Sequence, residues 1–523
     1  MACVWSADLY RALGRLSRRK VLTCLLMAAL PMAIRIVALR KVPIPEPLWD
    51  DEYSYLLGAD TLASGRLANP PHPMWVHFET MHVNWLPTYA TKFPPGQPLF
   101  LALGQRFLGH PWFGVWISFG LMCAALCWML QGWMPPLAAL LGTLVGMAAL
   151  GIFRYWMDSY CGGAVPAMGG CLVVGAAARL ARRTSASAAA LGSGGLMLLA
   201  ASRPFEGIVV SLAAAIVLVW WRWRTGKGWR GLFTARTLVP FAAICGLSAA
   251  WLGYYNYKVT GSPLLLPYVA NNRMYGANPQ FWLLPDVPIP EYRHEIVRKI
   301  WAVWTRNQYL SARHNPLVVV LPFLKNVRFF WSPILGFLVL AGLLLARSRE
   351  VWLAVAVVAA LCTGLLLEVG IGPHYFAPGI LLLLVPIMYA VRWLRIAGQR
   401  HGPMLVLLLV GIALIAAFRH DSYHDPEVSQ SRRKLIDALT RQGGRHVVLV
   451  RYAPGDDIPT VDLAYNGADI DGSTIIWARY MGEERDRALA AYYPDRTFWI
   501  VQADTSPLKL LPYDNLRNGE ASR

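Results

Sequence analysis

Apolar and polar positions follow one another along this chain in long blocks. Eleven apolar runs recur between the N-terminus and residue 418, and most are close to the ~20 residues that a helix needs to cross a bilayer. They cover residues 21–39, 112–131, 136–152, 162–180, 188–202, 206–221, 237–256, 329–346, 351–369, 376–391 and 403–418. The pattern predicts a polytopic α-helical membrane protein with about eleven transmembrane helices.

One further apolar stretch, residues 97–108, is too short for a span. Counting it as a span would move every later loop to the opposite side of the membrane, and the basic loops would then no longer face the cytoplasm. We therefore expect an interfacial or re-entrant helix there.

Three hydrophilic regions interrupt or follow the apolar runs: residues 40–110, residues 257–328 and the tail, residues 419–523. The tail contains three strand-like segments, at 446–450, 474–478 and 497–501, and two amphipathic helical segments, at 431–442 and 483–493. We expect a transmembrane domain over residues 1–418 and a small C-terminal α/β domain over residues 419–523.

Charge orients the expected helices in the membrane. The net charge is +19, which could suggest a nucleic-acid partner, but the basic residues concentrate in short loops between alternate apolar runs, such as "ARLARR" at 178–183. Positively charged loops stay on the cytoplasmic side. The distribution predicts a cytoplasmic N-terminus, an extracytoplasmic tail, two large extracytoplasmic loops at 40–110 and 257–328, and no nucleic-acid partner.

Three adjacent acids, Asp50, Asp51 and Glu52, stand shortly after the first apolar run. One interpretation is a helix start, with Asp50 as the N-cap and the other two acids in the first turn. The other is a general base held rigidly at the membrane surface. The two interpretations are compatible.

Several cations and aromatic residues stand where the outer ends of the spans are expected. Lys92 precedes two prolines, and its charge could meet an anionic headgroup or only extend toward water. Arg203 stands at the extracytoplasmic end of a span, where the charge rule predicts few cations. Its presence there favours a role in binding an anion. His374 and Tyr375 could reach a polar headgroup or anchor the interface.

The stretch "FRYWMDSY" places Arg154 four residues before Asp158. The spacing allows an ion pair across one helical turn. It also allows Asp158 to act as a second acid that faces the first across an outer cavity.

Metal and disulfide signals are weak in this sequence. His72, His77 and His82 recur every five residues, which is not the spacing of helical metal ligands, so no metal site is assigned. Most of the cysteines lie inside apolar runs, which gives no disulfide framework. The glycine-rich segment at 161–170 is typical of close helix packing.

Four stretches together resemble the GT-C superfamily of membrane glycosyltransferases: "DDEYSYLLGADTLASGRL" (50–67), "KFPPGQ" (92–97), "RYWMDSY" (154–160) and "ASRPFEG" (201–207). The chain looks most like bacterial members related to protein mannosyltransferases and to the aminoarabinose transferase of lipid A. The resemblance covers roughly residues 20–395.

The resemblance implies a sugar donor linked to polyprenyl phosphate and transfer, with inversion, on the extracytoplasmic face of the bacterial inner membrane. The acceptor would be an envelope glycan, lipid or protein, and membrane lipids would be further partners. The resemblance implies no required cofactor and does not decide whether a divalent metal takes part.

The resemblance also suggests roles for individual residues. Asp51 matches the catalytic aspartate, Glu52 would support it or bind the acceptor, and Asp158 matches the second acid. Lys92 matches a phosphate-binding lysine, although Phe93 separates it from the prolines. The remaining substrate-binding candidates are Tyr55, Arg154, Arg203, His374 and Tyr375.

Two other function classes fit part of the pattern. A transporter or flippase for a lipid-linked sugar would bind the same lipid, but it should show internal repeats with broken helices. A non-catalytic envelope assembly protein would use the tail as a binding module. In a glycosyltransferase, we expect the tail to be an accessory domain that positions the acceptor or covers the cavity, and its removal should leave donor binding intact.

Overall fold

The computed structural model describes residues 2–330, 332–346, 348–417, 426–453, 462–503, 505 and 507–513. The chain divides into two compact units. The first unit comprises Met1–Ile44, Trp112–Leu252 and His314–Asp421, and the second comprises Pro45–Pro111, Gly253–Arg313 and Ser422–Arg523. The domain boundary expected at 418–419 lies outside the described residues.

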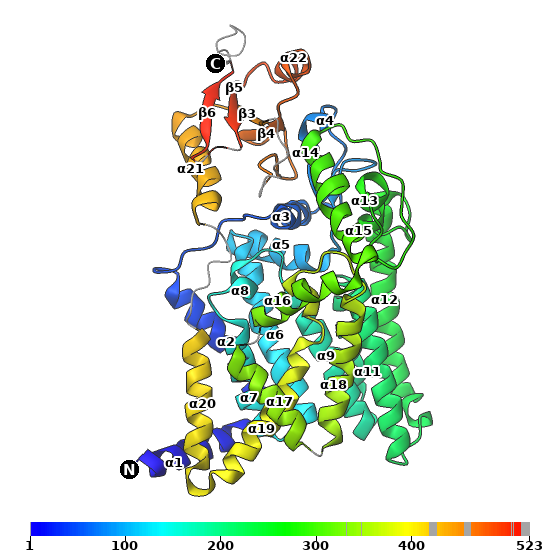
Figure 1. Ribbon diagram of the computed structural model, residues 1–523, viewed down its shortest axis with the longest axis vertical. Helices are drawn as coiled ribbons and strands as arrows, with labels where there is room; N and C mark the ends of the chain where they lie inside the picture. Colours follow the sequence, from blue (N-terminus) through cyan, green and yellow to red (C-terminus); the bar gives the residue numbers. More distant parts are fainter. Residues whose placement is uncertain are drawn as a thin grey trace. The chain divides into compact units, whose positions relative to one another are not determined.

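The first unit is a bundle of helices (Figure 1). Its α-helices are α1 (Ala2–Ser17), α2 (Lys20–Ala38), α6 (Trp112–Trp133), α7 (Pro136–Leu150), α8 (Tyr155–Asp158), α9 (Ala164–Arg182), α10 (Ala186–Ala200), α11 (Pro204–Arg224), α12 (Ala235–Thr260, which continues into the second unit), α16 (Val320–Phe330), α17 (Pro333–Leu345), α18 (Arg349–Leu365), α19 (Leu384–Ala397) and α20 (Gly402–Ala417). Short 3₁₀ turns connect them at η1 (Arg230–Leu232), η3 (Pro316–Val319), η4 (Pro373–Phe376), η5 (Ile380–Leu383) and η6 (Gln399–His401).

Membrane-spanning helices confirm a multi-pass membrane protein. Among the described residues, six helical stretches are long and apolar enough to cross a bilayer, and a bent pair, α16 with α17, would add a seventh. The six are Lys20–Ala38, Trp112–Trp133, Ala164–Arg182, Pro204–Arg224, Ala235–Thr260 and Ile380–Ala397. The count of about eleven is not confirmed, because helices such as α7 and α10 have 15 residues. Such a helix is about 22 Å long, which is less than the ~30 Å of a hydrocarbon core.

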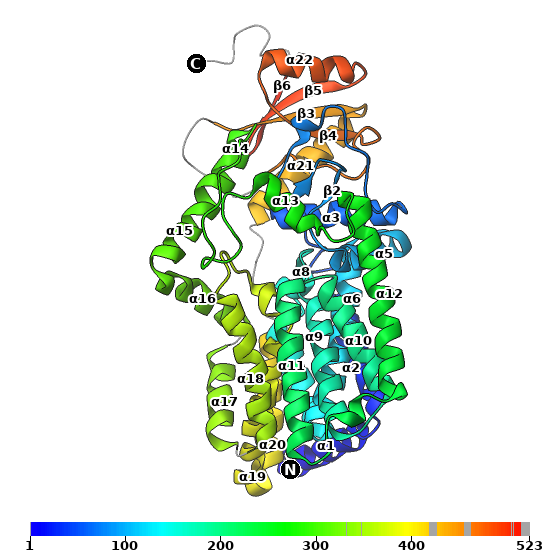
Figure 2. The same cartoon turned by 90° about the vertical axis from the view of Figure 1, so that its right-hand side faces the viewer.

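Helix α9 lies at the centre of the bundle, where it packs against α6, α10 and α11 (Figure 2). Glycine permits this close packing. A Cβ added at Gly169 would lie 3.0 Å from the carbonyl oxygen of Gly195, and one at Gly170 would lie 1.8 Å from that of Pro378. The glycine-rich segment therefore serves close packing of the backbone, as the sequence predicts.

The second unit is built from three segments that are distant in sequence. Its helices are α3 (Asp50–Ala63), α4 (Trp75–Phe78), α5 (Gly96–Leu108), α13 (Pro267–Tyr275), α14 (Glu295–Arg298), the π-helical turn η2 (Lys299–Thr305), α15 (Arg306–His314), α21 (Pro426–Gln442) and α22 (Glu483–Tyr492). Its strands are β1 (Val83–Asn84), β2 (Ala90–Thr91), β3 (His446–Arg451), β4 (Ile475–Arg479), β5 (Thr497–Gln502) and β6 (Lys509–Pro512). Helix α5 occupies the short apolar stretch that the charge pattern did not count as a span.

Four strands of the tail form one sheet in the order β4-β3-β5-β6, with β3 parallel to β4 and β5, and β6 antiparallel to β5. Alternate residues of β3 enter two different cores. Val448 and Val450 pack with Leu439 of α21, while Val447 and Leu449 share a core with Phe78 and other residues of the 45–111 segment. Helices α21 and α22 contribute to the cores on opposite faces of the sheet (Figure 1).

The shared core places the tail in the same compact unit as the other two segments. Residues of 45–111, such as Trp85, of 253–313, such as Trp301, and of β4, such as Ile476, belong to one buried cluster. A parallel sheet needs both faces covered. The tail covers one face with α21, and segments from elsewhere in the sequence help to cover the other.

Candidate active site

Helix α3 begins within the acidic stretch that the sequence analysis singled out. Trp49 is its N-cap and Asp50 its first helical residue. The buried carboxylate of Glu52 accepts hydrogen bonds from the backbone N–H groups of Leu48 (2.8 Å) and Trp49 (3.2 Å). The expected capping by Asp50 is therefore wrong: Glu52 satisfies the backbone donors that precede the helix.

Asp50 binds the backbone of the tail instead of capping its own helix. Its Oδ1 atom accepts a hydrogen bond from the backbone N–H of Asp462, at 3.2 Å. Burial, followed by the negative charge of Asp462, raises the pKa of Asp50 to about 8. Asp50 is therefore mostly protonated at neutral pH, which reduces the repulsion that it exerts on Asp51.

Asp51 is paired with a histidine that the sequence analysis had considered only as a metal ligand. Its Oδ1 atom lies 3.0 Å from Nε2 of His82. The Asp51 side chain keeps 34% of its surface exposed, against 18% for His82. His82 therefore holds one oxygen of Asp51, and the Asp51 side chain stays partly exposed to solvent, as a general base must be.

Lys92, directly after β2, is buried among aromatic rings. Its ammonium nitrogen lies 5.2 Å from the ring centroids of Phe93 and Tyr268 and 5.3 Å from that of Trp301. Tyr55 stacks on Phe93 with a centroid distance of 4.2 Å. Aromatic faces attract a cation, so this cage favours the charged form of Lys92.

Asp158 in the first unit pairs with a residue that the sequence analysis missed. Its Oδ1 atom accepts a hydrogen bond from Arg35 of α2, at 3.1 Å, and both side chains are buried. Arg35 also donates to the carbonyl oxygens of Val42 (2.7 Å) and Pro43 (3.1 Å). Arg154 donates to a backbone carbonyl five residues earlier. An arginine inside an apolar run is a signal in its own right, because intramembrane charge is costly.

The other candidates of the first unit form two small groups. Tyr155 is hydrogen-bonded to Nδ1 of His374. The guanidinium of Arg203 lies 4.0 Å from the ring centroid of Tyr375 and 3.6 Å from the carboxylate of Glu206. Arg203 therefore has both a stacking partner and an acid nearby.

The structure thus assembles the sequence candidates into two sets, one in each unit. The second unit holds Asp51, Glu52, Tyr55 and Lys92, and the first holds Arg154, Asp158, Arg203, His374 and Tyr375. Within the second unit, His82 lies beside both Asp51 and the charge of Lys92. We call Asp51, His82 and Lys92, with the rings of Phe93, Tyr268 and Trp301, the acid–lysine site.

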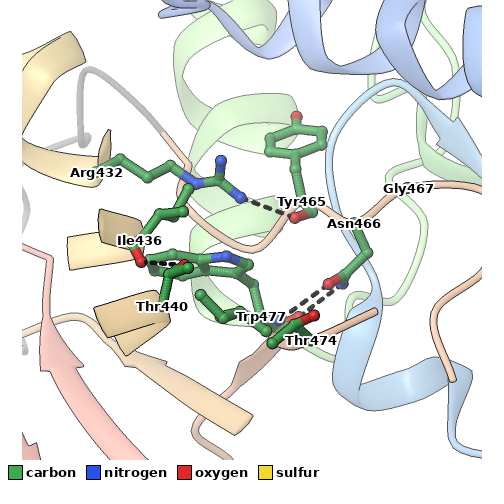
Figure 3. Close-up of a pocket in the computed structure, with 9 residues that line it drawn as sticks. Arg432, Ile436, Thr440, Tyr465, Asn466, Gly467, Thr474 and Trp477 are labelled. Atoms are coloured by element: carbon green, nitrogen blue, oxygen red, sulfur yellow. Dashed lines mark hydrogen bonds between the residues drawn. The ribbon is translucent and has the colours of Figure 1, made fainter. Parts of the chain in front are cut away.

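The tail contains a pocket of about 280 Å³ between α21 and β4 (Figure 3). Arg432 crosses it, stacked 4.4 Å from the Trp477 ring centroid, and donates to the carbonyl oxygen of Tyr465. The Asn466 side chain bonds both the N–H and the C=O of Trp477. These bonds satisfy part of the open edge of β4. The lining residues include no carboxylate, so we place the chemistry at the acid–lysine site instead.

The other two histidines of the first hydrophilic region also pair with acids. His72 lies 3.0 Å from Asp471, and His77 lies 3.8 Å from Asp486. In the part of the chain that the structure describes, no group of three or more His, Cys, Asp or Glu side chains is arranged to hold a metal ion.

Comparison with solved structures identifies the fold. The oligosaccharyltransferase of Archaeoglobus fulgidus in its apo form matches with a TM-score of 0.51 and 12% identity, over 92% of this chain and 69% of that chain. ArnT of Cupriavidus metallidurans in the apo state matches with a TM-score of 0.50 and 11% identity, over 95% and 94%. The same ArnT bound to undecaprenyl phosphate gives a TM-score of 0.48 at 13% identity, also over 95% and 94%.

No protein-family model and no curated protein matches the sequence. The structural likeness shows that the chain shares the fold of the archaeal oligosaccharyltransferase and of ArnT, which is the fold that the GT-C resemblance implied.

Proposed function

We propose that this protein is a membrane glycosyltransferase that moves a sugar from a polyprenyl-phosphate donor to an acceptor of the cell envelope. The observation that carries the proposal is the acid–lysine site, where a partly exposed carboxylate, Asp51, and a ring-caged ammonium, Lys92, are both close to His82. The GT-C fold supports it. One protein of that fold, ArnT, has been crystallised with undecaprenyl phosphate.

Each charge has a role in such a transfer. The ammonium of Lys92 would bind the donor phosphate and stabilise the charge that develops on it as the bond from the anomeric carbon to the phosphate oxygen breaks. Asp51 would take the proton of the acceptor hydroxyl while its oxygen forms the new bond to the anomeric carbon. Attack opposite to the leaving phosphate inverts that carbon.

The products are the glycosylated acceptor and polyprenyl phosphate, and the exchange of one bond for the other needs no redox cofactor. We place the reaction on the extracytoplasmic face of a bacterial inner membrane, as the charge distribution and the resemblance indicate. The acceptor would be a glycan, lipid or protein of the envelope.

The remaining candidates have subsidiary roles in this proposal. Glu52 fixes the start of α3 and thereby the direction of Asp51. Tyr55 supports the lysine cage through its stack on Phe93. For Asp158, the bond to Arg35 favours a role in fixing the first unit, and its role as a second acid remains a prediction.

For Arg154, Arg203, His374 and Tyr375, a role in substrate binding remains a prediction. Among these four, Arg203 has the clearest rationale, since a guanidinium stacked on an aromatic ring keeps donors at its edge for phosphate oxygens.

The test is transfer from defined lipid-linked sugars by the purified protein in liposomes. A panel of undecaprenyl-phosphate monosaccharides is offered with envelope extracts as acceptor, and released undecaprenyl phosphate is quantified by mass spectrometry. Asp51→Asn should lower turnover by about 10²- to 10⁴-fold, the usual contribution of a general base. The matched control is Asp50→Asn, the neighbouring acid. An active Asp51→Asn beside an inactive Asp50→Asn would overturn the assignment.

A further inference from the structure

We infer that His82 is a positioning residue for Asp51: its Nε2–H holds one carboxylate oxygen and thereby orients the partly exposed carboxyl group toward the acceptor hydroxyl. This inference deepens the proposed function and rests on it. It gives a task to a histidine that stands far from α3 in the sequence.

The exposure of the two side chains decides which of them receives the proton. The His82 side chain retains about half the relative exposure of Asp51, 18% against 34%. Within the described residues, its Nδ1 atom is buried and has no hydrogen-bond partner. An incoming hydroxyl can therefore reach the Asp51 carboxylate but not the free nitrogen of His82. The histidine orients, and the aspartate accepts the proton.

The backbone of His82 is held in an uncommon conformation. Its φ angle is +61°, in the left-handed region that non-glycine residues seldom adopt. Its carbonyl oxygen accepts a hydrogen bond from Oγ of Ser54, at 2.6 Å, and another from the backbone N–H of Lys92, at 3.1 Å. Ser54 lies on the same helix as Asp51, so these two bonds tie the histidine to both the acid and the lysine. A strained residue fixed in this way is typical of functional sites.

The surroundings keep the histidine neutral. Burial, and after it the positive charge of Lys92, lower the pKa of His82, and Asp51 opposes this only in part. Two neighbouring groups complete these surroundings. Asp50 is an acid close to Asp51. Trp301 of η2 places its ring 6.1 Å from the His82 ring. A neutral imidazole beside a carboxylate presents its N–H to it, which fixes the tautomer with the proton on Nε2.

Two substitutions separate the hydrogen bond from the backbone conformation. In His82→Gln, the amide nitrogen lies near the former Nε2 position and can still donate to Asp51. In His82→Asn, the shorter side chain cannot reach that position, but asparagine tolerates a left-handed φ. The inference predicts that Asn lowers kcat by about 10- to 100-fold, as expected when a bond to a charged group is lost. The kcat of His82→Gln should stay within about threefold of that of the parent protein. The KM for the donor should be unchanged in both variants.

The pH profile gives a readout that a purely structural role would not move. The Nε2–H bond stabilises the ionised carboxylate, so His82→Asn should shift the acidic limb of the kcat profile to higher pH, and His82→Gln should shift it less. A reversed order, with Asn active and Gln inactive, would show that the left-handed backbone matters and the donor does not. Unchanged kcat and an unchanged acidic limb in both variants would also overturn the inference.

A second measurement does not depend on transfer. Carbodiimide reacts with protonated carboxyl groups, and the pH dependence of Asp51 labelling is followed by peptide mass spectrometry of the full-length protein in detergent. His82→Asn should extend labelling to higher pH, and identical profiles in parent and variant would contradict the inference. If the parent protein labels as expected but transfers no sugar, the proposed function fails while the His82–Asp51 bond stands.

Discussion

The two units each bury a cation, and they do so in opposite ways. Arg35 in the first unit donates to two backbone carbonyls and to the carboxylate of Asp158. Lys92 in the second unit lies among three aromatic rings. The guanidinium fork suits several fixed acceptors, whereas the compact ammonium can lie close to several ring faces at once. The arginine is suited to fixing the bundle, and the lysine to attracting an anion.

The two acids differ in the same way. The Asp158 side chain is 9% exposed and lies against a buried arginine, while the Asp51 side chain is 34% exposed and lies against a neutral histidine. A carboxylate that is ion-paired and buried is a poor base, because the nearby cation favours its charged form. The comparison therefore predicts that changes in the first unit affect stability and that changes at the acid–lysine site affect chemistry.

The largest effect should follow from removing residues 422–523. Val447, Leu449 and Ile476 share a core with the 45–111 segment, and each fully buried aliphatic side chain is worth about 1.5–3 kcal/mol. For these three side chains alone the loss is about 4.5–9 kcal/mol, which is comparable to the ~5–15 kcal/mol by which a folded protein is usually stable. The second unit should fail to fold, so donor binding should be lost with it, contrary to an accessory role for the tail.

The measurement for the truncated chain is hydrogen exchange at α3, with the full-length protein as the control. Full protection of α3 in the truncated chain, together with intact binding of undecaprenyl phosphate, would contradict the shared core and restore the accessory role.

Next in size is the buried ion pair of the first unit. Arg35→Met or Asp158→Asn should each lower the free energy of unfolding by about 3–5 kcal/mol, because one partner then remains buried without the other. The combined Arg35→Met/Asp158→Leu variant should recover part of that loss. Thermal unfolding in detergent measures all three.

Asp51→Asn is the control for the Arg35 and Asp158 variants. Because Asp51 is partly exposed, this substitution should change the free energy of unfolding little. If Asp158→Asn were as stable as the parent protein but inactive, Asp158 would belong to the chemistry rather than to the fold.

A smaller effect is expected at the lysine cage. Lys92→Met keeps the length of the side chain and removes the charge, so it should weaken binding of undecaprenyl phosphate by about 1.5–3 kcal/mol, the value of a charge-assisted hydrogen bond. Lys258→Met, which alters an exposed lysine of the same unit, is the matched control. Affinity measured by native mass spectrometry should fall only for Lys92→Met, and an equal affinity for both variants would remove Lys92 from the donor site.

The smallest effect concerns pH and Asp50. Its pKa is raised to about 8 in the folded protein, so between about pH 4 and pH 8 the folded state binds a proton that the unfolded state has released. The contribution of Asp50 to stability therefore falls as pH rises through this window. Asn accepts the same hydrogen bond but does not titrate.

Asp50→Asn should accordingly be more stable than the parent protein near pH 8.5 and lose that advantage toward pH 4. Unfolding temperatures at several pH values test this. A difference between the two proteins that does not change with pH would mean that Asp50 is already ionised in the folded state.

The sequence by itself determined the local elements. The apolar run at 112–131 corresponds to α6, and the strand-like segment at 446–450 corresponds to β3. The helix expected near Asp50 is α3. These predictions succeed because backbone hydrogen bonding and side-chain periodicity are local properties of a segment. The capping by Asp50 failed because Trp49 is the N-cap, and the Asp50 carboxylate instead accepts a hydrogen bond from the backbone N–H of Asp462, far along the chain.

Only the tertiary structure decided which residues meet. Lys92 acquires its cage from Tyr268 and Trp301, which stand in a hydrophilic region far along the chain, and Asp51 acquires its partner from the segment before β1. Nothing in the spacing of these residues indicates such contacts, because they depend on how three separate segments share one core. The identities of the candidate acid and lysine were readable from the sequence, whereas the histidine beside them was placed by the burial of apolar side chains elsewhere in the same unit.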